Sequence, residues 1–149
     1  MAKIRLGRSA DLDTATDSVN FSLVLVVGKS HINCIVVSRI VERSGLKAMS
    51  EPPDKATKAL CGSRPGIVIL DGGADNRDCD AALIEIAERR RAFGSNVPLV
   101  ILLSTRNVTP ENLPHSRAID AVVAKPFTPE SLQPVVDRLL TQAKASAPL

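Results

Sequence analysis

The sequence predicts an α/β fold, a three-layer sandwich in which helices cover both faces of a parallel sheet. Five short apolar runs rich in β-branched residues alternate with segments of helical periodicity. The composition is 44% hydrophobic but only 2% aromatic, so aliphatic side chains must build the interior, as in sheets buried on both faces. A chain of 149 residues is long enough for one such domain.

The N-terminal residues 1–20 are polar, carry Asp11, Asp13 and Asp17, and show no apolar period. We expect them to form a flexible tail. The run 23–27 is continuous, apolar and rich in valine, which predicts a buried strand.

The next segments alternate helix and strand. Residues 31–43 carry apolar residues at helical spacing and are followed by Gly45, which predicts a helix and its end. These apolar residues are Ile32, Ile35, Val36, Ile40 and Val41. We expect a short strand at 46–49, a small helix from Asp54 that Gly62 and Pro65 stop, and a strand at 66–70.

The second half begins with a strong helix over 78–93, followed by a strand at 98–103. Its inward residues would be Ala82, Leu83, Ile86 and Ala87. The run Arg89–Arg91 lies at the end of this helix, where positive charge suits the helix dipole. A solvated helix end is favoured there over a phosphate-binding patch.

The last elements are an irregular segment, a strand and a helix. Residues 105–119 contain two prolines, so any helix there is short. A strand is predicted at 121–124, and Thr128-Pro129 opens a helix to about residue 143. Its inward residues would be Leu132, Val135, Val136, Leu139 and Leu140. We therefore expect one domain over 21–144 and a tail over 145–149.

Composition excludes several classes of protein. The net charge of +3 is spread along the chain without interleaved aromatic residues, which argues against a nucleic-acid-binding protein. No apolar run reaches the length of a membrane span, and the N-terminus lacks the apolar region of a signal peptide. Cys34, Cys61 and Cys79 are odd in number and widely spaced, which favours reduced thiols and a cytoplasmic location.

Polar side chains stand where the predicted strands end. Asp71, Ser104 and Lys125 each follow an apolar run directly, and Gly28-Lys29-Ser30 follows the first run. Because the carboxyl ends of parallel strands meet at one edge of a sheet, these residues should share a crevice. A carboxylate, a hydroxyl and an ammonium suit phosphoryl transfer to the carboxylate, but residues 28–30 offer no carboxylates to hold a metal.

Residues 21–144 resemble the receiver domain of bacterial response regulators. The matching segments are Val26–Asn33, Ile67–Asp71, Leu102–Ser104 and, most specifically, Ala124–Leu132. The resemblance implies a flavodoxin-like, five-stranded parallel sheet of order 2-1-3-4-5. It implies that Asp71 is the phosphoacceptor and that Ser104 and Lys125 bind the phosphoryl group. Gly73, Asp78 and Pro126 would complete the pocket.

The sequence departs from that family at several positions. Gly28 and Lys29 replace the acidic metal-binding pair, leaving Asp71 and the carbonyl of Gly73 as the obvious oxygen ligands. Val122 replaces the aromatic switch residue three positions before Lys125, and Cys79 stands where glycine is usual. We expect Mg²⁺ binding to be weak or absent and no other cofactor.

The leading hypothesis is a stand-alone, atypical receiver in which Lys29 and Lys125 flank Asp71 and metal-dependent phosphorylation is weak or lost. Retained but slow phosphorylation, and a phosphorylation-independent adaptor of the same fold, stay open as alternatives. The sequence Gly28-Lys29-Ser30 also resembles the end of a P-loop, but residue 23 is leucine where glycine is required, which disfavours a nucleotide-binding enzyme. No enzyme activity is expected beyond self-phosphorylation on Asp71.

The resemblance also implies the partners. These would be a histidine kinase or phosphotransfer protein and a downstream protein, with a homodimer as a further option. By analogy with the family, the interface would lie on residues 105–140. Neither nucleic acid nor a membrane is expected as a partner.

Overall fold

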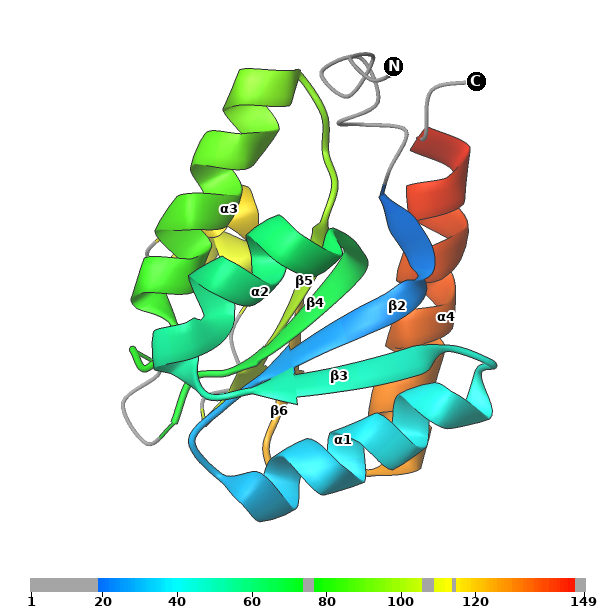
Figure 1. Cartoon of the computed structure of the whole chain (residues 1–149). Helices are drawn as coiled ribbons and strands as arrows, with labels where there is room; N and C mark the ends of the chain where they lie inside the picture. The colour runs from blue at the N-terminus through cyan, green and yellow to red at the C-terminus, as the bar shows by residue number, and fades with distance from the viewer. Residues whose placement is uncertain (1–18, 74–76, 106–108, 114, 147–149) are drawn as a thin grey trace, which may run out of the picture.

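The computed structural model describes residues 19–73, 77–105, 109–113 and 115–146, and within them the sheet has five strands, all parallel (Figure 1). The strands are β2 (Asn20–Val27), β3 (Lys47–Glu51), β4 (Pro65–Asp71), β5 (Leu99–Ser104) and β6 (Ala121–Ala124). Their spatial order is β3-β2-β4-β5-β6. Counted in chain order this is 2-1-3-4-5, so the predicted flavodoxin-like topology is confirmed.

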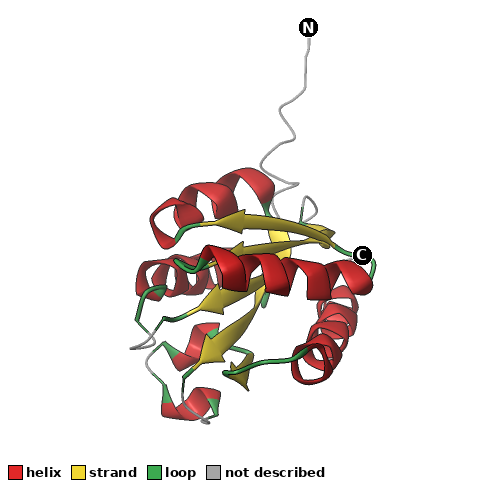
Figure 2. Cartoon of the chain, turned by 90° about the horizontal axis from the view of Figure 1, so that it is seen from below, coloured by secondary structure: helices red, strands yellow, loops and turns green. Residues whose placement is uncertain are grey.

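Helices cover both faces of this sheet, which confirms the three-layer sandwich (Figure 2). The helices are α1 (His31–Arg43), α2 (Ala56–Ser63), α3 (Asp80–Phe93) and α4 (Pro129–Ser146). Helices α1 and α4 pack on one face, and α2 and α3 on the other. Three 3₁₀ turns, η2 (Pro53–Lys55), η3 (Pro110–Asn112) and η4 (Ser116–Ala118), complete the described elements. No helix in the described ranges is both long and apolar enough to cross a bilayer.

The core consists of two aliphatic layers that alternate along the central strands. In β4 all seven residues are buried. Ile67 and Ile69 face the α1 and α4 layer, whereas Val68 and Leu70 face the α2 and α3 layer. This is the period of two that a strand covered on both faces produces, and it explains why the interior needs so few aromatic residues.

Helix α1 spans the predicted residues but buries a different face. The buried side chains are Cys34, Val37, Ile40 and Val41. Three residues of the apolar pattern are instead exposed: Ile32 at 73%, Ile35 at 44% and Val36 at 41%. The helix carries apolar residues on two nearly opposite sides, about 150° apart at 3.6 residues per turn, and periodicity alone does not decide which side packs on the sheet.

The ends of the elements differ modestly from the prediction. Strand β2 begins at Asn20, inside the segment expected to be a tail, because the Asn20 N–H donates to the Arg64 carbonyl at 2.9 Å. The rest of that segment, residues 1–18, lies outside the described residues, as do 147–149. Helix α4 extends to Ser146, and between β5 and β6 the described residues form only the turns η3 and η4, as the prolines predicted.

The prediction of a solvated arginine run at the end of α3 is wrong for Arg90. Its guanidinium donates to the carbonyl of Pro98 through Nε at 3.2 Å and Nη2 at 2.7 Å, and to the carbonyl of Arg117 through Nη1 at 2.9 Å. It also pairs with the Asp120 carboxylate, which accepts the Val100 N–H at 2.7 Å. Arg90 thereby ties the end of α3 to the starts of β5 and β6.

Candidate functional site

The fold brings three predicted site residues to one edge of the sheet. Asp71 is the last residue of β4 and Ser104 the last of β5, while Lys125 follows β6 directly. The Lys125 N–H donates to the Ser104 carbonyl at 2.8 Å, which fixes the chain direction after β6. Ser104 is fully buried.

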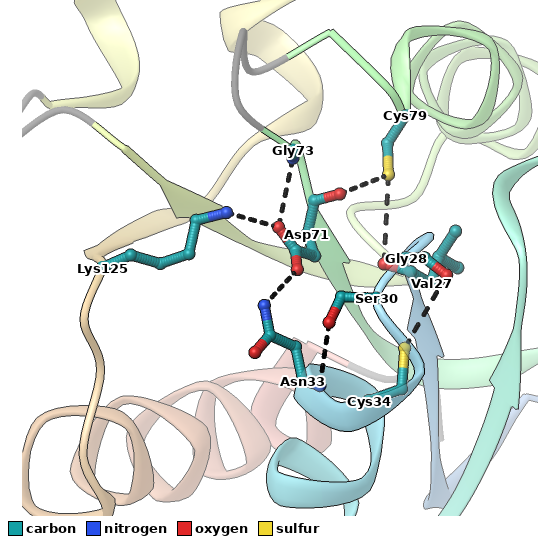
Figure 3. Close-up of polar contacts among 9 residues, drawn as sticks. All are labelled: Val27, Gly28, Ser30, Asn33, Cys34, Asp71, Gly73, Cys79 and Lys125. Carbon is teal, nitrogen blue, oxygen red and sulfur yellow. Dashed lines mark hydrogen bonds and ion pairs between the residues drawn. The ribbon is translucent and has the colours of Figure 1, made fainter.

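The Asp71 carboxylate is held by three donors (Figure 3). Oδ1 accepts from Lys125 Nζ at 2.6 Å and from the Gly73 N–H at 3.1 Å, and Oδ2 accepts from Asn33 Nδ2 at 2.9 Å. Burial raises the pKa of this carboxyl, but the hydrogen bonds from Lys125, Asn33 and Gly73 outweigh it and set the pKa below its ordinary value. Asp71 is therefore an ionised carboxylate at neutral pH.

Asn33 reaches Asp71 because of how α1 begins. Ser30 is the N-cap residue of this helix, and its Oγ accepts the Asn33 N–H at 3.2 Å. Asn33 thus lies in the first turn, at the carboxyl edge of the sheet. Asn33 was not among the site residues predicted from the sequence, although it ends the segment Val26–Asn33 that resembles the receiver family.

Lys29 does not flank Asp71 as predicted. Its ammonium pairs with Asp78 Oδ1 at 3.5 Å, and its side chain is 70% exposed. An ion pair this exposed contributes at most about 1 kcal/mol to stability. Lys125 is therefore the lysine that contacts the phosphoacceptor candidate, while Lys29 neutralises the neighbouring Asp78.

Gly28 lies so close to Asp71 that no side chain fits between them. A Cβ atom on Gly28 would lie 2.9 Å from the Cβ of Asp71 and 3.4 Å from the Cys34 sulfur. The structure thus gives a packing reason for glycine at position 28.

The loop after β4 folds tightly around Gly73. Gly73 has a φ of +75°, and a Cβ there would overlap the Asp78 carboxylate. The Asp78 N–H donates to the Gly72 carbonyl at 3.1 Å. The last two predicted site residues are placed without a contact to Asp71 among the described interactions: Pro126 follows Lys125 through a cis bond, and Val122 packs half-buried against the α2 and α3 layer.

The described residues around Asp71 leave few oxygen atoms free to bind a magnesium ion. Magnesium needs several oxygen ligands, and the oxygens of Asp71 already accept hydrogen bonds from three protein donors. The Asp78 carboxylate pairs with Lys29, and position 28 has no room for a carboxylate. Among the described ranges no group of three or more His, Cys, Asp or Glu residues could hold a metal ion.

Two buried cysteine thiols lie beneath the site, against the backbone of Asp71 and Gly28. The Cys79 thiol donates to the Asp71 carbonyl at 3.3 Å, and the Cys34 thiol to the Gly28 carbonyl at 3.8 Å (Figure 3). Burial, with the Asp71 charge as a second cause, raises the pKa of Cys79 to about 12 and raises that of Cys34. Both thiols stay protonated and act as packing groups.

The fold is shared with solved response regulators. The chemotaxis response regulator CheY4 of Vibrio cholerae superposes with a TM-score of 0.65 at 19% identity, covering 80% of this chain and 99% of that chain. A response regulator from Thermotoga maritima gives 0.63 at 21% identity, covering 80% and 97%. This chain has the receiver-domain fold.

A third structure agrees with this assignment. The signal receiver domain of a putative LuxO repressor protein from Vibrio parahaemolyticus gives a TM-score of 0.67 at 19% identity, covering 83% of this chain and 93% of that one. No protein-family model and no curated protein sequence matches the chain. The P-loop alternative is wrong on the geometry, because Leu23–Val27 belong to strand β2 and cannot form a phosphate-binding loop.

Proposed function

We propose that the chain is an atypical receiver in a two-component phosphorelay, with Asp71 as its inherited phosphoacceptor and with magnesium-dependent phosphorylation weak or lost. The contact between Lys125 Nζ and Asp71 Oδ1, at the carboxyl edge of a receiver-type sheet, supports this proposal most directly. An ionised carboxylate can act as the nucleophile in acyl phosphate formation, and an ammonium fixed beside it can pair with the charge of the phosphoryl group.

The hydrogen bonds indicate which carboxylate oxygen would react. Oδ1 has two donors, Lys125 and Gly73, whereas Oδ2 has only Asn33. Oδ2 is thus the freer nucleophile toward the phosphorus of a phosphohistidine or of acetyl phosphate. The new Oδ2–P bond forms as the donor leaves with the electron pair of its own bond to phosphorus. Lys125 then pairs with the charge of the phosphoryl oxygens.

The arrangement around Asp71 explains why magnesium would contribute little. A divalent ion normally neutralises the charge that develops on the transferred group. Here the Lys29 ammonium stands beside Asp78, and the backbone of Gly28 packs directly against Asp71. Lysine is a monovalent point charge and cannot bridge a carboxylate and a phosphoryl group. We therefore expect slow transfer or none.

A phosphorylation-independent adaptor is favoured by one further observation, the exposed apolar face of α1. Ile32, Ile35 and Val36 form this face, on the helix whose first turn carries Asn33. Among the described residues, the large exposed apolar side chains lie on α1 and α3, and none lies on η3, η4 or α4. The α1 face is thus a better docking surface than the residues 105–140 that the sequence suggested.

The size of the α1 face favours a transient protein partner over a stable homodimer. Three partly exposed aliphatic side chains offer at most a few hundred Å², of the order of a functional patch on a monomer. A stable dimer buries about 800 Å² on each partner. A signalling partner that docks on α1 would sit beside Asp71 whether or not phosphate is transferred.

Treatment with acetyl phosphate followed by intact-mass measurement tests the proposal. In the presence of Mg²⁺ the wild type should gain little or no phosphoryl mass, and any gain should disappear in Asp71→Asn. Lys29→Asp places a carboxylate beside Asp78 and should gain Mg²⁺-dependent labelling. Labelling that persists in Asp71→Asn would refute Asp71 as the phosphoacceptor.

The adaptor alternative makes a different prediction. Proteins that co-purify with the wild type should be lost with Ile32→Ser and Ile35→Ser, because these changes remove the α1 face. They should be retained with Asp71→Asn. Loss with Asp71→Asn would favour the phosphorylation-gated receiver instead.

A further inference from the structure

A small hollow lies at the amino-terminal edge of the sheet, at the opposite end of the strands from Asp71. Its lining includes Val19, Leu60, Arg64, Arg89 and Phe93. Its cavity volume is about 30 Å³. That is room for a water molecule or the end of one side chain, well short of a drug-sized ligand.

Arg89 gives this hollow an unmet hydrogen-bonding group. Its Nε is out of contact with solvent and has no hydrogen-bond partner within the described part of the chain. The Nε atom lies 3.3 Å from Glu85 Oε2, so the two side chains form an ion pair, but they are not aligned for a hydrogen bond. A buried donor left unpaired is destabilising, so an acceptor beside Arg89 would stabilise the fold.

The hollow also exposes apolar surface beside this charge. Phe93 is 49% exposed, and a second arginine, Arg64, lies on the same rim. A partner that matches this rim would carry an aliphatic side chain for Phe93 and carboxylates for the two arginines. Such a group would cover the Phe93 ring and give the Arg89 guanidinium an acceptor.

The chain itself carries such a segment, and it ends at the hollow. Residues 1–18 precede Val19, which is part of the lining. Within residues 9–18 Leu12 is the one large apolar residue, it stands between Asp11 and Asp13, and no lysine or arginine is present. Leu12 is seven residues from Val19, a reach of up to about 25 Å, enough to turn back onto the edge of the sheet.

We propose that the hollow is the docking site of the chain's own N-terminal segment, with Leu12 against Phe93 and the carboxylates of Asp11 and Asp13 facing Arg89. The earlier apolar residues Ile4 and Leu6 are poor candidates, because Lys3, Arg5 and Arg8 surround them and the rim is basic. The docked segment would hold its carboxylates at the far end of β2 from Asp71, unable to supply a metal ligand there.

Cys61 makes the test direct. It is exposed on α2, next to Leu60 of the lining, while Cys34 and Cys79 are buried, so a thiol-reactive nitroxide labels Cys61 alone. In ¹⁵N-labelled full-length protein, the amide signals of residues 11–13 should lose at least about half their intensity with the oxidised label relative to the reduced one. Equal intensities would overturn the proposal.

Variants distinguish signal loss caused by the proposed contacts from signal loss caused only by the short distance along the chain. Arg89→Gln should restore the intensities, while Arg39→Gln, the same charge change on exposed α1, should leave them reduced. Leu12→Ser and the double change Asp11→Asn with Asp13→Asn should also restore them, and these positions precede the described fold. Intensities that stay reduced in all these variants would refute the proposed contacts. Signal loss only between a spin-labelled copy and a separate ¹⁵N copy would assign the hollow to a second chain instead.

Discussion

The backbone of Gly28 packs against the side chain of Asp71, so that a methyl group on Gly28 would lie 2.9 Å from the Asp71 Cβ. Packing this close means that position 28 cannot carry a carboxylate without moving the phosphoacceptor candidate. The packing of the site therefore explains why position 28 carries no side chain. Lys29, which is exposed, is the neighbouring position at which a carboxylate could be introduced without a clash.

This packing predicts the effect of enlarging Gly28. Gly28→Ala should lower the free energy of unfolding by about 1–3 kcal/mol, because Asp71 or its neighbours must shift. Gly62→Ala is the matched control, since Gly62 lies in α2 with nothing within 4 Å of a Cβ there. It should raise the free energy of unfolding by about 0.5–1 kcal/mol. Urea denaturation measures both, and a neutral Gly28→Ala would contradict the close packing.

The ion pair between Asp71 and Lys125 predicts a pH-dependent stability. The pKa of Asp71 is lowered, so its contribution is complete above the ordinary carboxyl value and is lost as pH falls through the lower folded value. Asp71→Asn should cost about 1–3 kcal/mol at pH 7, since it leaves Lys125 without its partner. The difference from wild type should shrink below about pH 4.

A double-mutant cycle isolates that pair. Lys125→Met combined with Asp71→Asn should be less destabilised than the sum of the single changes, by about 1–3 kcal/mol at pH 7. Additive effects, or an Asp71→Asn variant more stable than wild type at pH 7, would show that the carboxylate is not satisfied in the folded protein. Thermal melts from pH 3 to pH 8 provide the data.

The Arg90 network predicts a large difference between neighbouring arginines. Arg90→Gln removes the ion pair with Asp120 and the hydrogen bonds to two carbonyls, and should cost about 2–4 kcal/mol. Arg91→Gln, at an exposed position one residue later, should stay within about 0.5 kcal/mol of wild type. Equal effects in denaturant titrations would contradict the structural role of Arg90.

The cysteines should differ in reactivity. Cys61 is exposed, whereas the pKa of Cys79 is raised by burial and the nearby Asp71 charge to about 12, and that of Cys34 is raised as well. An Ellman assay at pH 8 should therefore titrate one thiol in the native protein and three after denaturation. Rapid reaction of a second thiol in the native state would contradict the burial of Cys34 and Cys79.

The sequence was sufficient to predict a parallel sheet and the edge where Asp71, Ser104 and Lys125 meet, because the strands are apolar along their whole length and end in polar residues. The order of the strands was implied by the resemblance to receiver domains and does not follow from the apolar pattern. Asp71 and Lys125 meet as soon as β4 and β6 are parallel neighbours of β5. The buried face of α1 could not be predicted from the apolar pattern, because the helix has apolar residues on two sides and only packing on the sheet selects one of them.

The ion-pair partners of Lys29 and Arg90 also could not be predicted from the sequence. Lys29 turns to Asp78 rather than Asp71, and Arg90 turns inward to Asp120, in each case toward a carboxylate from a distant segment. Spacing along one element cannot reveal such a partner. The absence of room at Gly28 is likewise a property of the assembled sheet.

The dependence of Asp71 labelling on magnesium tests the central claim most directly. The measurement is the rate of phosphoryl incorporation from acetyl phosphate, by intact mass, in wild type and Lys29→Asp, with Mg²⁺ and with a chelator. The account predicts that magnesium changes the wild-type rate by no more than about twofold and accelerates Lys29→Asp more strongly. A tenfold magnesium-dependent acceleration in wild type, about 1.4 kcal/mol of transition-state stabilisation, would contradict it.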